Sequence, residues 1–479
     1  MLEGIYKTIN KTSDLFESSR QGLEAVRRDD PVLYKLLELE TRRQSNVLPM
    51  VAASSEADPS VLACEGLALT NVTTEGYPNA RFHGGCEIVD QVEELAIERA
   101  CAVFDAQYAN VQPHSGSSAN LAVIFSLLRP GDTLLGMDLD AGGHLTHGSK
   151  ASVIGQYFNA VGYGVNAHGV IDYDEVRDIA RKCQPRLIIC GASAYSRIID
   201  FAAFRAIADE VGALLLADIS HIAGLVVGGV HPSPIDHAHV TTTSTYKQLF
   251  GPRGGVILCG RDSSQAAWSG KGTFADTFQR AVFPFSQGTP NLSAIAAKAR
   301  AFANVQRPEF KLLARRIVDN AQALASYLLE RSYDVLTGGT DNHTILINLS
   351  DKAMTGLVAE RALNQCGIIV NKNRLPGDTK SARVTSGIRL GTNLLAHRGL
   401  APSDMRECAE LIDETLMSIR VMSDQDYELE ESVIHSVRAR VERICCRFRD
   451  TELNPLGTSL PVEINNPTAI GNSDRAGEL

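Results

Sequence analysis

The feature of this sequence that most constrains its fold is a regular alternation of short apolar runs and helical stretches between about Val89 and about Asp262. The apolar runs have the length of β-strands, as in PRLIICGASAY, ALLLADISH and GGVILCG, and amphipathic segments such as YDEVRDIARK separate them. Such alternation is typical of a mainly parallel sheet covered by helices. The sequence therefore predicts an α/β fold.

The pattern changes along the chain, whose length suggests roughly two to three domains. We predict a helical N-terminal arm over residues 1–50, a large domain over 51–305 and a smaller α/β domain over 306–450. Residues 451–479 are rich in Asn, Pro, Gly and Ser, which favours a flexible tail.

Charge and cysteine content exclude several classes of function. The formal net charge is -10, so the chain has no overall excess of Lys and Arg that could attract phosphates, and we expect no nucleic-acid partner. We find no secretory signal and no apolar run long enough for a bilayer, so we expect a cytoplasmic protein without a membrane partner. The ten cysteines contain no C-x-x-C pair, which predicts free thiols. His144 and His147 have a spacing seen in metal sites, but no acid or cysteine with ligand spacing accompanies them, so we predict no metal.

The string TTTSTYKQLFGPRGG at 241–255 surrounds Lys247 with hydroxyl residues and a glycine-rich turn that contains Arg253. Lysine usually lies on a solvated surface, so this residue by itself is ambiguous. Hydroxyl groups and glycine backbone N–H groups can bind a phosphate, and a nearby positive charge favours the neutral amine that a Schiff base requires. Lys247 is therefore a candidate nucleophile.

The apolar run ALLLADISHIAGL ends at Asp218, and His221 follows three residues later. Ligands of open parallel sheets bind beyond the carboxyl ends of the strands, so this acid is well placed to pair with the nitrogen of a cofactor ring. The alternative is a carboxylate that only caps the next helix.

Four further motifs have both a functional and a structural interpretation. In VQPHSGSSANLAV, the residues around Ser115 can form a phosphate cup or an ordinary helix N-cap. In GGHLTHG, His144 can stack on a flat cofactor. In TSGIRLGT, Arg389 can bind a carboxylate bidentately or form a surface ion pair. In TEGYPNARFHGGCE, Glu75 is either functional or a solvated carboxylate.

Taken in order, these strings resemble the serine hydroxymethyltransferase family from about Leu48 to about Leu416, together with DISHIAGLVVGGV and TGGTDNH. The resemblance implies the fold type I, aspartate-aminotransferase-like architecture of pyridoxal-phosphate enzymes. That architecture has a large domain with a mostly parallel seven-stranded sheet and a smaller C-terminal α/β domain. It also implies a homodimer, or a tetramer of two dimers, whose active sites are shared between subunits.

The resemblance further implies transfer of a one-carbon unit between a β-hydroxy amino acid and tetrahydrofolate, with pyridoxal phosphate as cofactor. The implied catalytic residues are Lys247, which would carry the cofactor as a Schiff base, Asp218, His144, His221 and the acid/base residue Glu75. Further cofactor contacts would be Ser115, Gly116, Ser117, Ser193, Thr73 and Gly288, the last in a loop that reaches the partner subunit's phosphate. Arg389, His83, Tyr246 and Arg253 would face the amino acid. Phe82, Leu139, Gly143 and Asn373 would line the folate pocket together with Glu75.

The sequence also departs from the family pattern, mainly around the amino-acid substrate. The family's Ser-Glu-Asn-Phe string is Ala-Ser-Ser-Glu at 53–56, so a carboxylate-binding serine is absent. The other departures are Thr73 for a tyrosine, Phe82 and His83 for two tyrosines, Tyr246 for a histidine, Ala141 for a histidine and Thr289 for a glycine.

These departures motivate the hypothesis that the substrate is an α-substituted amino acid, such as α-methylserine and alanine. Two alternatives stay open. One is a folate-independent aldolase or transaldolase that acts on a β-hydroxy amino acid, and the other is a non-catalytic protein with the same fold.

Overall fold

The computed structural model describes residues 15–268 and 270–449. The predicted flexible tail at 451–479 lies outside these residues, as do the first fourteen residues of the predicted arm. In the described part of the chain, no helix is both long enough and apolar enough to cross a membrane.

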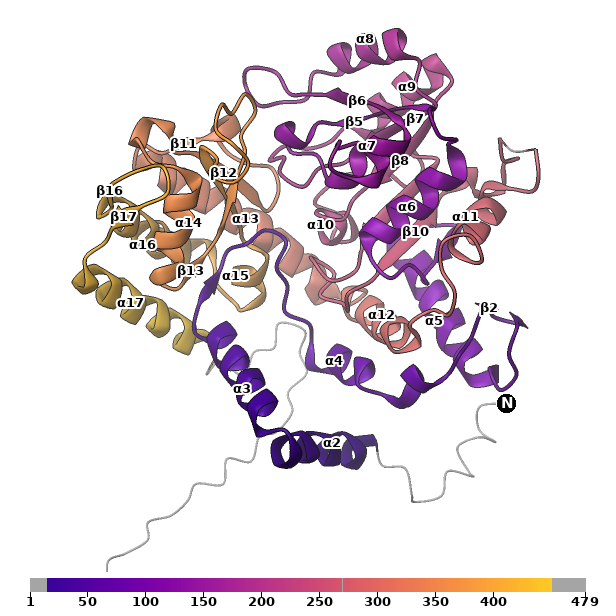
Figure 1. The fold of residues 1–479 in the computed structure, drawn as a ribbon, viewed down its shortest axis with the longest axis horizontal. Helices are drawn as coiled ribbons and strands as arrows, with labels where there is room; N and C mark the ends of the chain where they lie inside the picture. The colour runs from indigo at the N-terminus through magenta and orange to yellow at the C-terminus, as the bar shows by residue number, and fades with distance from the viewer. Residues whose placement is uncertain (1–14, 269, 450–479) are drawn as a thin grey trace, which may run out of the picture.

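A seven-stranded sheet forms the centre of the molecule (Figure 1). Its strands are parallel except for the pairings of one strand, β10, which runs antiparallel to both of its neighbours. The predicted mostly parallel sheet is therefore confirmed. In spatial order the strands are β4 (Tyr108–Asn110), β10 (Gly255–Cys259), β9 (Val240–Ser244), β8 (Leu214–Asp218), β7 (Leu187–Cys190), β5 (Thr133–Met137) and β6 (Asn159–Tyr163).

Helices cover both faces of this sheet, which explains why its strands are apolar almost throughout. In β8, Leu214 and Leu216 face one hydrophobic core, while Leu215 and Ala217 face the other. The first core contains residues of α6 (Gly116–Leu127), α7 (Val153–Tyr157) and α11 (Phe274–Val282). The second contains residues of α5 (Glu87–Phe104), α8 (Tyr173–Cys183), α9 (Phe201–Val211), α10 (Ala223–Val227) and α12 (Leu292–Val305).

A smaller antiparallel sheet lies in the C-terminal part of the chain (Figure 1). Its order is β11 (Asp334–Val335), β12 (Thr344–Asn348), β15 (Gly387–Gly391) and β14 (Asn371–Asn373). The helices α14 (Gly356–Gln365), α16 (Met405–Met417) and α17 (Glu431–Arg449) pack around it in a separate core.

One long helix, α13 (Pro308–Glu330), connects the two parts of the molecule. Its first half, from Phe310 to Val318, is buried in the core of the large sheet. Its second half, from Ala321 to Leu328, is buried in the C-terminal core. The apolar face of α13 therefore belongs to both cores.

The N-terminal segment forms α2 (Leu15–Asp29), α3 (Pro31–Ser45) and the short strand β1 (Leu48–Pro49). β1 pairs with β13 (Ile368–Ile369) in parallel, and Leu48 and Met50 are buried in the C-terminal core. The end of the segment expected to be an arm is therefore part of the small-sheet unit. By contrast, no residue of α3 is buried, and α2 and α3 lie at the periphery of the fold (Figure 1).

Candidate active site

Lys247 lies three residues beyond the end of β9, beside the hydroxyl-rich strand that the sequence places before it. Its Nζ donates a hydrogen bond to Oγ of Ser244 over 3.1 Å. Two cations lie over the Tyr246 ring, with Nζ of Lys247 at 4.9 Å and Cζ of Arg253 at 4.1 Å from the ring centroid. The lysine is half-buried, so its amine is held near the carboxyl ends of the parallel strands but remains accessible.

Asp218 ends the neighbouring strand β8, and its carboxylate is buried. Oδ2 accepts hydrogen bonds from Nδ2 of Asn120 at 2.8 Å and from Nε2 of His147 at 3.1 Å, while Oδ1 accepts one from the backbone N–H of Ser220 at 3.0 Å. Burial by itself would raise the pKa of Asp218, but the hydrogen bond and charge of His147 and the charge of His144 outweigh it and place this pKa well below its ordinary value. Asp218 therefore carries a fixed negative charge at neutral pH.

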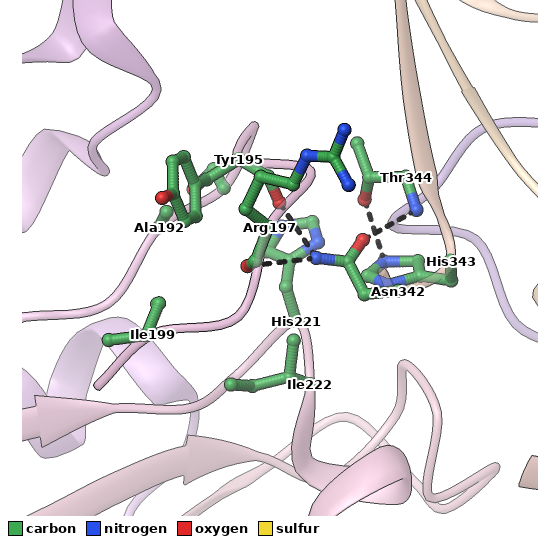
Figure 2. A pocket seen from close by; sticks show the side chains of 10 residues that line it. Ala192, Tyr195, Arg197, Ile199, His221, Ile222, Asn342, His343 and Thr344 are labelled. Carbon is green, nitrogen blue, oxygen red and sulfur yellow. Dashed lines mark hydrogen bonds between the residues drawn. The ribbon is translucent and has the colours of Figure 1, made fainter. Parts of the chain in front are cut away.

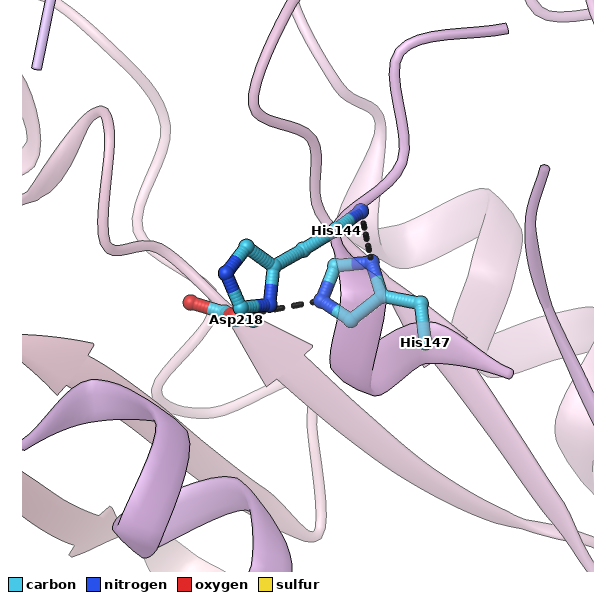
Figure 3. A group of neighbouring side chains, drawn as sticks. All are labelled: His144, His147 and Asp218. Carbon is cyan, nitrogen blue, oxygen red and sulfur yellow. Dashed lines mark hydrogen bonds and ion pairs between the residues drawn. The ribbon is translucent and has the colours of Figure 1, made fainter. Parts of the chain in front are cut away.

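His144 and His147 approach Asp218 from the segment after β5 (Figure 3). One ligand atom from each of these three residues lies within 4.8 Å of the others, so the tertiary structure supplies the acid that the sequence spacing lacked. Asp218, however, already accepts three hydrogen bonds, and the His144 ring is fixed by Nδ1, 2.8 Å from Oγ1 of Thr146. A buried carboxylate beside a flat imidazole fits the protonated nitrogen of an aromatic cofactor ring at least as well as it fits a metal ion.

The start of α6 lies next to these groups and offers free backbone N–H groups to an anion. Ser115 caps the helix, because its Oγ accepts from the N–H of Ser118 at 3.0 Å and its own N–H donates to Oγ of Ser118 at 2.8 Å. Ser115 is therefore an N-cap residue in the structure. The side chain of Ser117 is exposed. A Cβ on Gly116 would lie 3.1 Å from Oγ of Ser220 and 3.2 Å from Ser244, so this glycine brings the helix start against the Lys247 site.

These observations together test whether pyridoxal phosphate fits here. The site provides an amine for the aldehyde, a buried carboxylate for the ring nitrogen, an imidazole beside the ring and a helix N-terminus for the phosphate. The residues present fit the cofactor.

Arg389 lies on β15 of the small sheet and is 9% exposed. Its Nη1 donates to the backbone carbonyl of Ser193, and its Nε donates to Oδ1 of Asn371 over 3.1 Å. Burial lowers the pKa of Arg389 to about 10, so the guanidinium stays charged at neutral pH. The predicted cofactor contact Ser193 and the predicted carboxylate ligand Arg389 are thus in direct contact.

His221 lies in a small pocket between the large sheet and the small sheet (Figure 2). Its ring stacks on that of His343, with ring centroids 5.9 Å apart. Among the residues that the structure describes, none gives Nδ1 of His221 a hydrogen bond. Burial, together with the charges of Lys247 and Arg389, lowers the pKa of His221 well below its ordinary value. This neutral imidazole therefore keeps an unused nitrogen, which is suited to a cofactor or substrate oxygen.

The stack predicts an acid-sensitive stability. Burial and the charges of Arg389 and Lys247 lower the pKa of His343 to about 3. Between about pH 6.5 and pH 3, this histidine is therefore protonated in the unfolded chain but neutral in the folded chain. Stability is lost as the pH falls from about 6.5 towards 3. Between pH 7 and pH 5 we expect the free energy of unfolding to fall by about 2 kcal/mol more in the wild type than in His343→Asn, measured by urea denaturation. The exposed control His168→Asn should follow the wild type, and identical slopes for wild type and His343→Asn would contradict the assignment.

A second group of predicted residues lies on exposed loops. Nε2 of His83 is 3.7 Å from Oε2 of Glu75, and a Cβ on Gly288 would lie 3.3 Å from Oε1 of the same glutamate. Phe82 is 73% exposed and contacts Phe283 edge-to-face at 5.6 Å. Thr73 is also exposed.

This second group does not meet the first within one chain. Over residues 15–268 and 270–449, no hydrogen bond, ion pair or ring contact joins Glu75, Phe82 or His83 to Lys247. Among these described residues, the predicted acid/base residue therefore makes no direct contact with the predicted nucleophile of its own chain.

The three other predicted folate residues come from two parts of the chain. Leu139, which is 45% exposed, and Gly143 follow β5, whereas Asn373 ends β14 of the small sheet. An ion pair of 2.6 Å between Asp140 and Arg374, the immediate neighbours of Leu139 and Asn373, holds the two segments together.

Some residues of the site were not identified as functional from the sequence. His147 and Asn120 both hydrogen-bond Asp218, and Ser244 binds Lys247. The spacing of His147 from His144 was a weak sequence signal for a functional role. For Asn120, the only signal was its position four residues after Gly116 on a predicted helix. Ser244 could not be distinguished from its hydroxyl neighbours.

Comparison with known proteins agrees with this geometry. The family model described as "Serine hydroxymethyltransferase" matches residues 26–412. A curated protein of that name from Chromohalobacter salexigens is 48% identical over 419 residues, which cover 88% of this chain and 96% of the relative. A match of this extent, on a fold and a site that fit pyridoxal phosphate, shows that the chain belongs to the serine hydroxymethyltransferase family.

Proposed function

We propose that this enzyme moves a one-carbon unit between a β-hydroxy amino acid and tetrahydrofolate, and that its preferred amino acid carries a substituent on Cα. The single observation that carries the first part is the arrangement of Lys247, Asp218 and the α6 N-terminus around one space. Pyridoxal phosphate, when bound, withdraws electrons from Cα of the amino acid.

Each side chain of this group then has a defined task. Lys247 would hold the cofactor through its amine, which stands beside Oγ of Ser244. Asp218 holds a proton on the ring nitrogen, and its low pKa keeps it ionised for this purpose. His144, whose Nδ1 is fixed by Thr146, would lie against the cofactor ring. Arg389 binds the substrate carboxylate, for which its buried, charged guanidinium is suited.

We also propose that Glu75 acts as the acid/base residue in the site of a second copy, within a homodimer. The 73% exposure of the Phe82 ring, next in the chain to His83 of the Glu75–His83 pair, supports this, because exposed apolar surface beside polar groups is typical of a contact with another chain. The unburied apolar side chains of α3, among them Leu36 at 59% exposure, also support a second copy. A cytoplasmic location agrees with the reduced thiols of the described chain, among them the buried Cys190, Cys259 and Cys408. The division near residue 305 agrees with α13, which begins at Pro308 and joins the two cores.

The preference for an α-substituted substrate rests on the surroundings of Lys247 and Arg389. Tyr246 stands beside Lys247 and stacks on Arg253, where the family has a histidine. The chain around Ala53 packs on the strand of Arg389, because the N–H of Gly391 donates to the carbonyl of Met50 over 2.7 Å. Ala53 stands where the family has a serine, and a methyl group at this position would give the substrate an apolar neighbour that favours an additional methyl on Cα.

The test compares kcat/KM for α-methylserine and serine with tetrahydrofolate, and for alanine and glycine in the reverse direction. We expect α-methylserine to be preferred by roughly 10-fold or more, the usual effect of one methyl group in a fitted pocket. The double variant His83→Tyr/Tyr246→His should move this ratio towards serine, whereas the exposed pair His168→Tyr/Tyr157→His should not. Serine and glycine as the best pair, without activity on α-methylserine, would reject the preference.

The same assay without tetrahydrofolate separates the alternative aldolase. Hydroxymethyl transfer requires the folate acceptor, so we expect cleavage of the amino acid to fall sharply when it is omitted. Undiminished cleavage of a β-hydroxy amino acid without folate would favour the aldolase, and the absence of any borohydride-reducible cofactor would favour a non-catalytic protein.

A further inference from the structure

A buried lysine, which has no role in the reaction proposed above, contacts the chain segment that leads into α6. Lys298 belongs to α12, whose many alanines allow a close approach to α5, and its side chain is 1% exposed. Its Nζ donates three hydrogen bonds to backbone carbonyls, to Val111 at 2.6 Å, to Pro113 at 3.0 Å and to Gly255 at 3.0 Å. Three acceptors match the three protons of an ammonium group, whereas a neutral amine would have one proton too few.

The three carbonyls belong to the segments that hold the start of α6. Val111 and Pro113 lie between β4 and the Ser115 cap, and Gly255 opens β10. The N–H of Gly255 also donates to the carbonyl of Pro113 over 2.9 Å. A Cβ on Gly255 would lie 2.2 Å from the carbonyl oxygen of Ser115, so these two chain segments are in close contact at this point.

Placing a lysine here costs free energy. Burial lowers the pKa of Lys298 to about 7, although the charge of Glu93 acts in the opposite direction. The charge of Lys298 also reaches the helix start, because it contributes, after burial, to the lowered pKa of His114, the residue before Ser115. An apolar residue would fill the same volume without this desolvation cost.

We propose that Lys298 is a positioning residue for the cofactor phosphate: it fastens residues 111–115 to β10 and adds a buried positive charge behind the N-terminus of α6. The inference rests on the proposed function only in placing the phosphate of pyridoxal phosphate at Ser115, Gly116 and Ser117. Both effects favour a dianionic group at that helix start.

The experiment measures the dissociation constants of pyridoxal phosphate and of pyridoxal, which lacks the phosphate, for the full-length apoprotein. Lys298→Met, which keeps the chain length without the charge, should bind pyridoxal phosphate about 10-fold or more weakly and pyridoxal equally well. The ³¹P resonance of the bound cofactor should also shift in this variant. The control Asn320→Leu changes a residue of α13 and removes its buried hydrogen bond to the carbonyl of Leu400, so it should lower Tm without either change.

Wild-type affinity and an unchanged ³¹P resonance in Lys298→Met would reduce Lys298 to a structural role and overturn the proposal. If that variant does not fold, Lys298→Gln, which retains two donors but no charge, decides the question by the same two readouts. Equal weakening for pyridoxal and its phosphate would also overturn it. Failure of the proposed function is recognised separately, since it would appear as a wild-type enzyme that binds pyridoxal phosphate but transfers no one-carbon unit to tetrahydrofolate.

Discussion

Lys247→Ala is expected to lower kcat for hydroxymethyl transfer by roughly 10³-fold or more, because no other amine occupies its place at the end of β9. The variant should also lose the visible absorption of covalently attached cofactor. Lys247→Arg tests the role of charge: arginine retains the cation next to Ser244 but is not a nucleophile. It should therefore be as inactive as the alanine variant.

The control for this prediction is Lys150→Ala, since Lys150 is exposed and lies in a different loop. It should retain wild-type kcat and absorption. A Lys247→Ala enzyme that keeps a tenth of the wild-type turnover would show that another group attaches the cofactor, and the assignment of the site would then be wrong.

Asp218→Asn is expected to lower kcat on the order of 10²-fold to 10³-fold, while the cofactor still binds covalently. The amide keeps the shape of the carboxylate, and its one oxygen can still accept from the N–H of Ser220, while its NH2 group takes the place of the oxygen that accepts from His147. It lacks the negative charge that the native environment secures by lowering the pKa of Asp218. Electron withdrawal by the cofactor ring depends on a protonated ring nitrogen, which an amide cannot maintain.

Spectra and kinetics of two variants check this prediction. Asp172→Asn changes an aspartate that caps α8, and it should leave kcat unaltered. Asp218→Asn should still show the absorption of bound cofactor, so that its loss of turnover cannot be attributed to loss of the cofactor. Unchanged kcat in Asp218→Asn would contradict the proposed pairing of this carboxylate with the ring nitrogen.

The sequence predicted the elements that carry strong apolar signals and overlooked the weak ones. The runs that form β7, β8 and β10 were identified as strands because fully buried strands are continuously apolar. By contrast, β9 has the sequence VTTTS, and its threonines are buried although they are polar, with the hydroxyls of Thr242 and Thr243 donating to Oδ1 of Asn120 and to the carbonyl of Ser244. The strand that precedes Lys247 was therefore recognised as a motif but not as a strand.

The residues of the candidate site also fall into those that the sequence indicated and those that only the tertiary structure revealed. The spacing of Asp218 and His221 after an apolar run indicated a strand end, and the structure places Asp218 there. His147 offered no acid nearby in sequence, because its partner Asp218 is 71 residues away and meets it only through the sheet order. Lys298 gave no signal at all within an alanine-rich helix, since the carbonyls that bind it are contributed by segments far from it in the chain.

The sequence by itself determined the α/β class, the strand ends that carry function and the family resemblance, because period and motif strings are local properties of the chain. Only the tertiary structure decided which groups meet: that His144 and His147 surround Asp218, that Arg389 contacts Ser193, and that Glu75 stays apart from Lys247 in one chain. The physical reason is that burial, pairing and charge depend on distances between segments that the sheet order and α13 bring together, and no local pattern contains those distances.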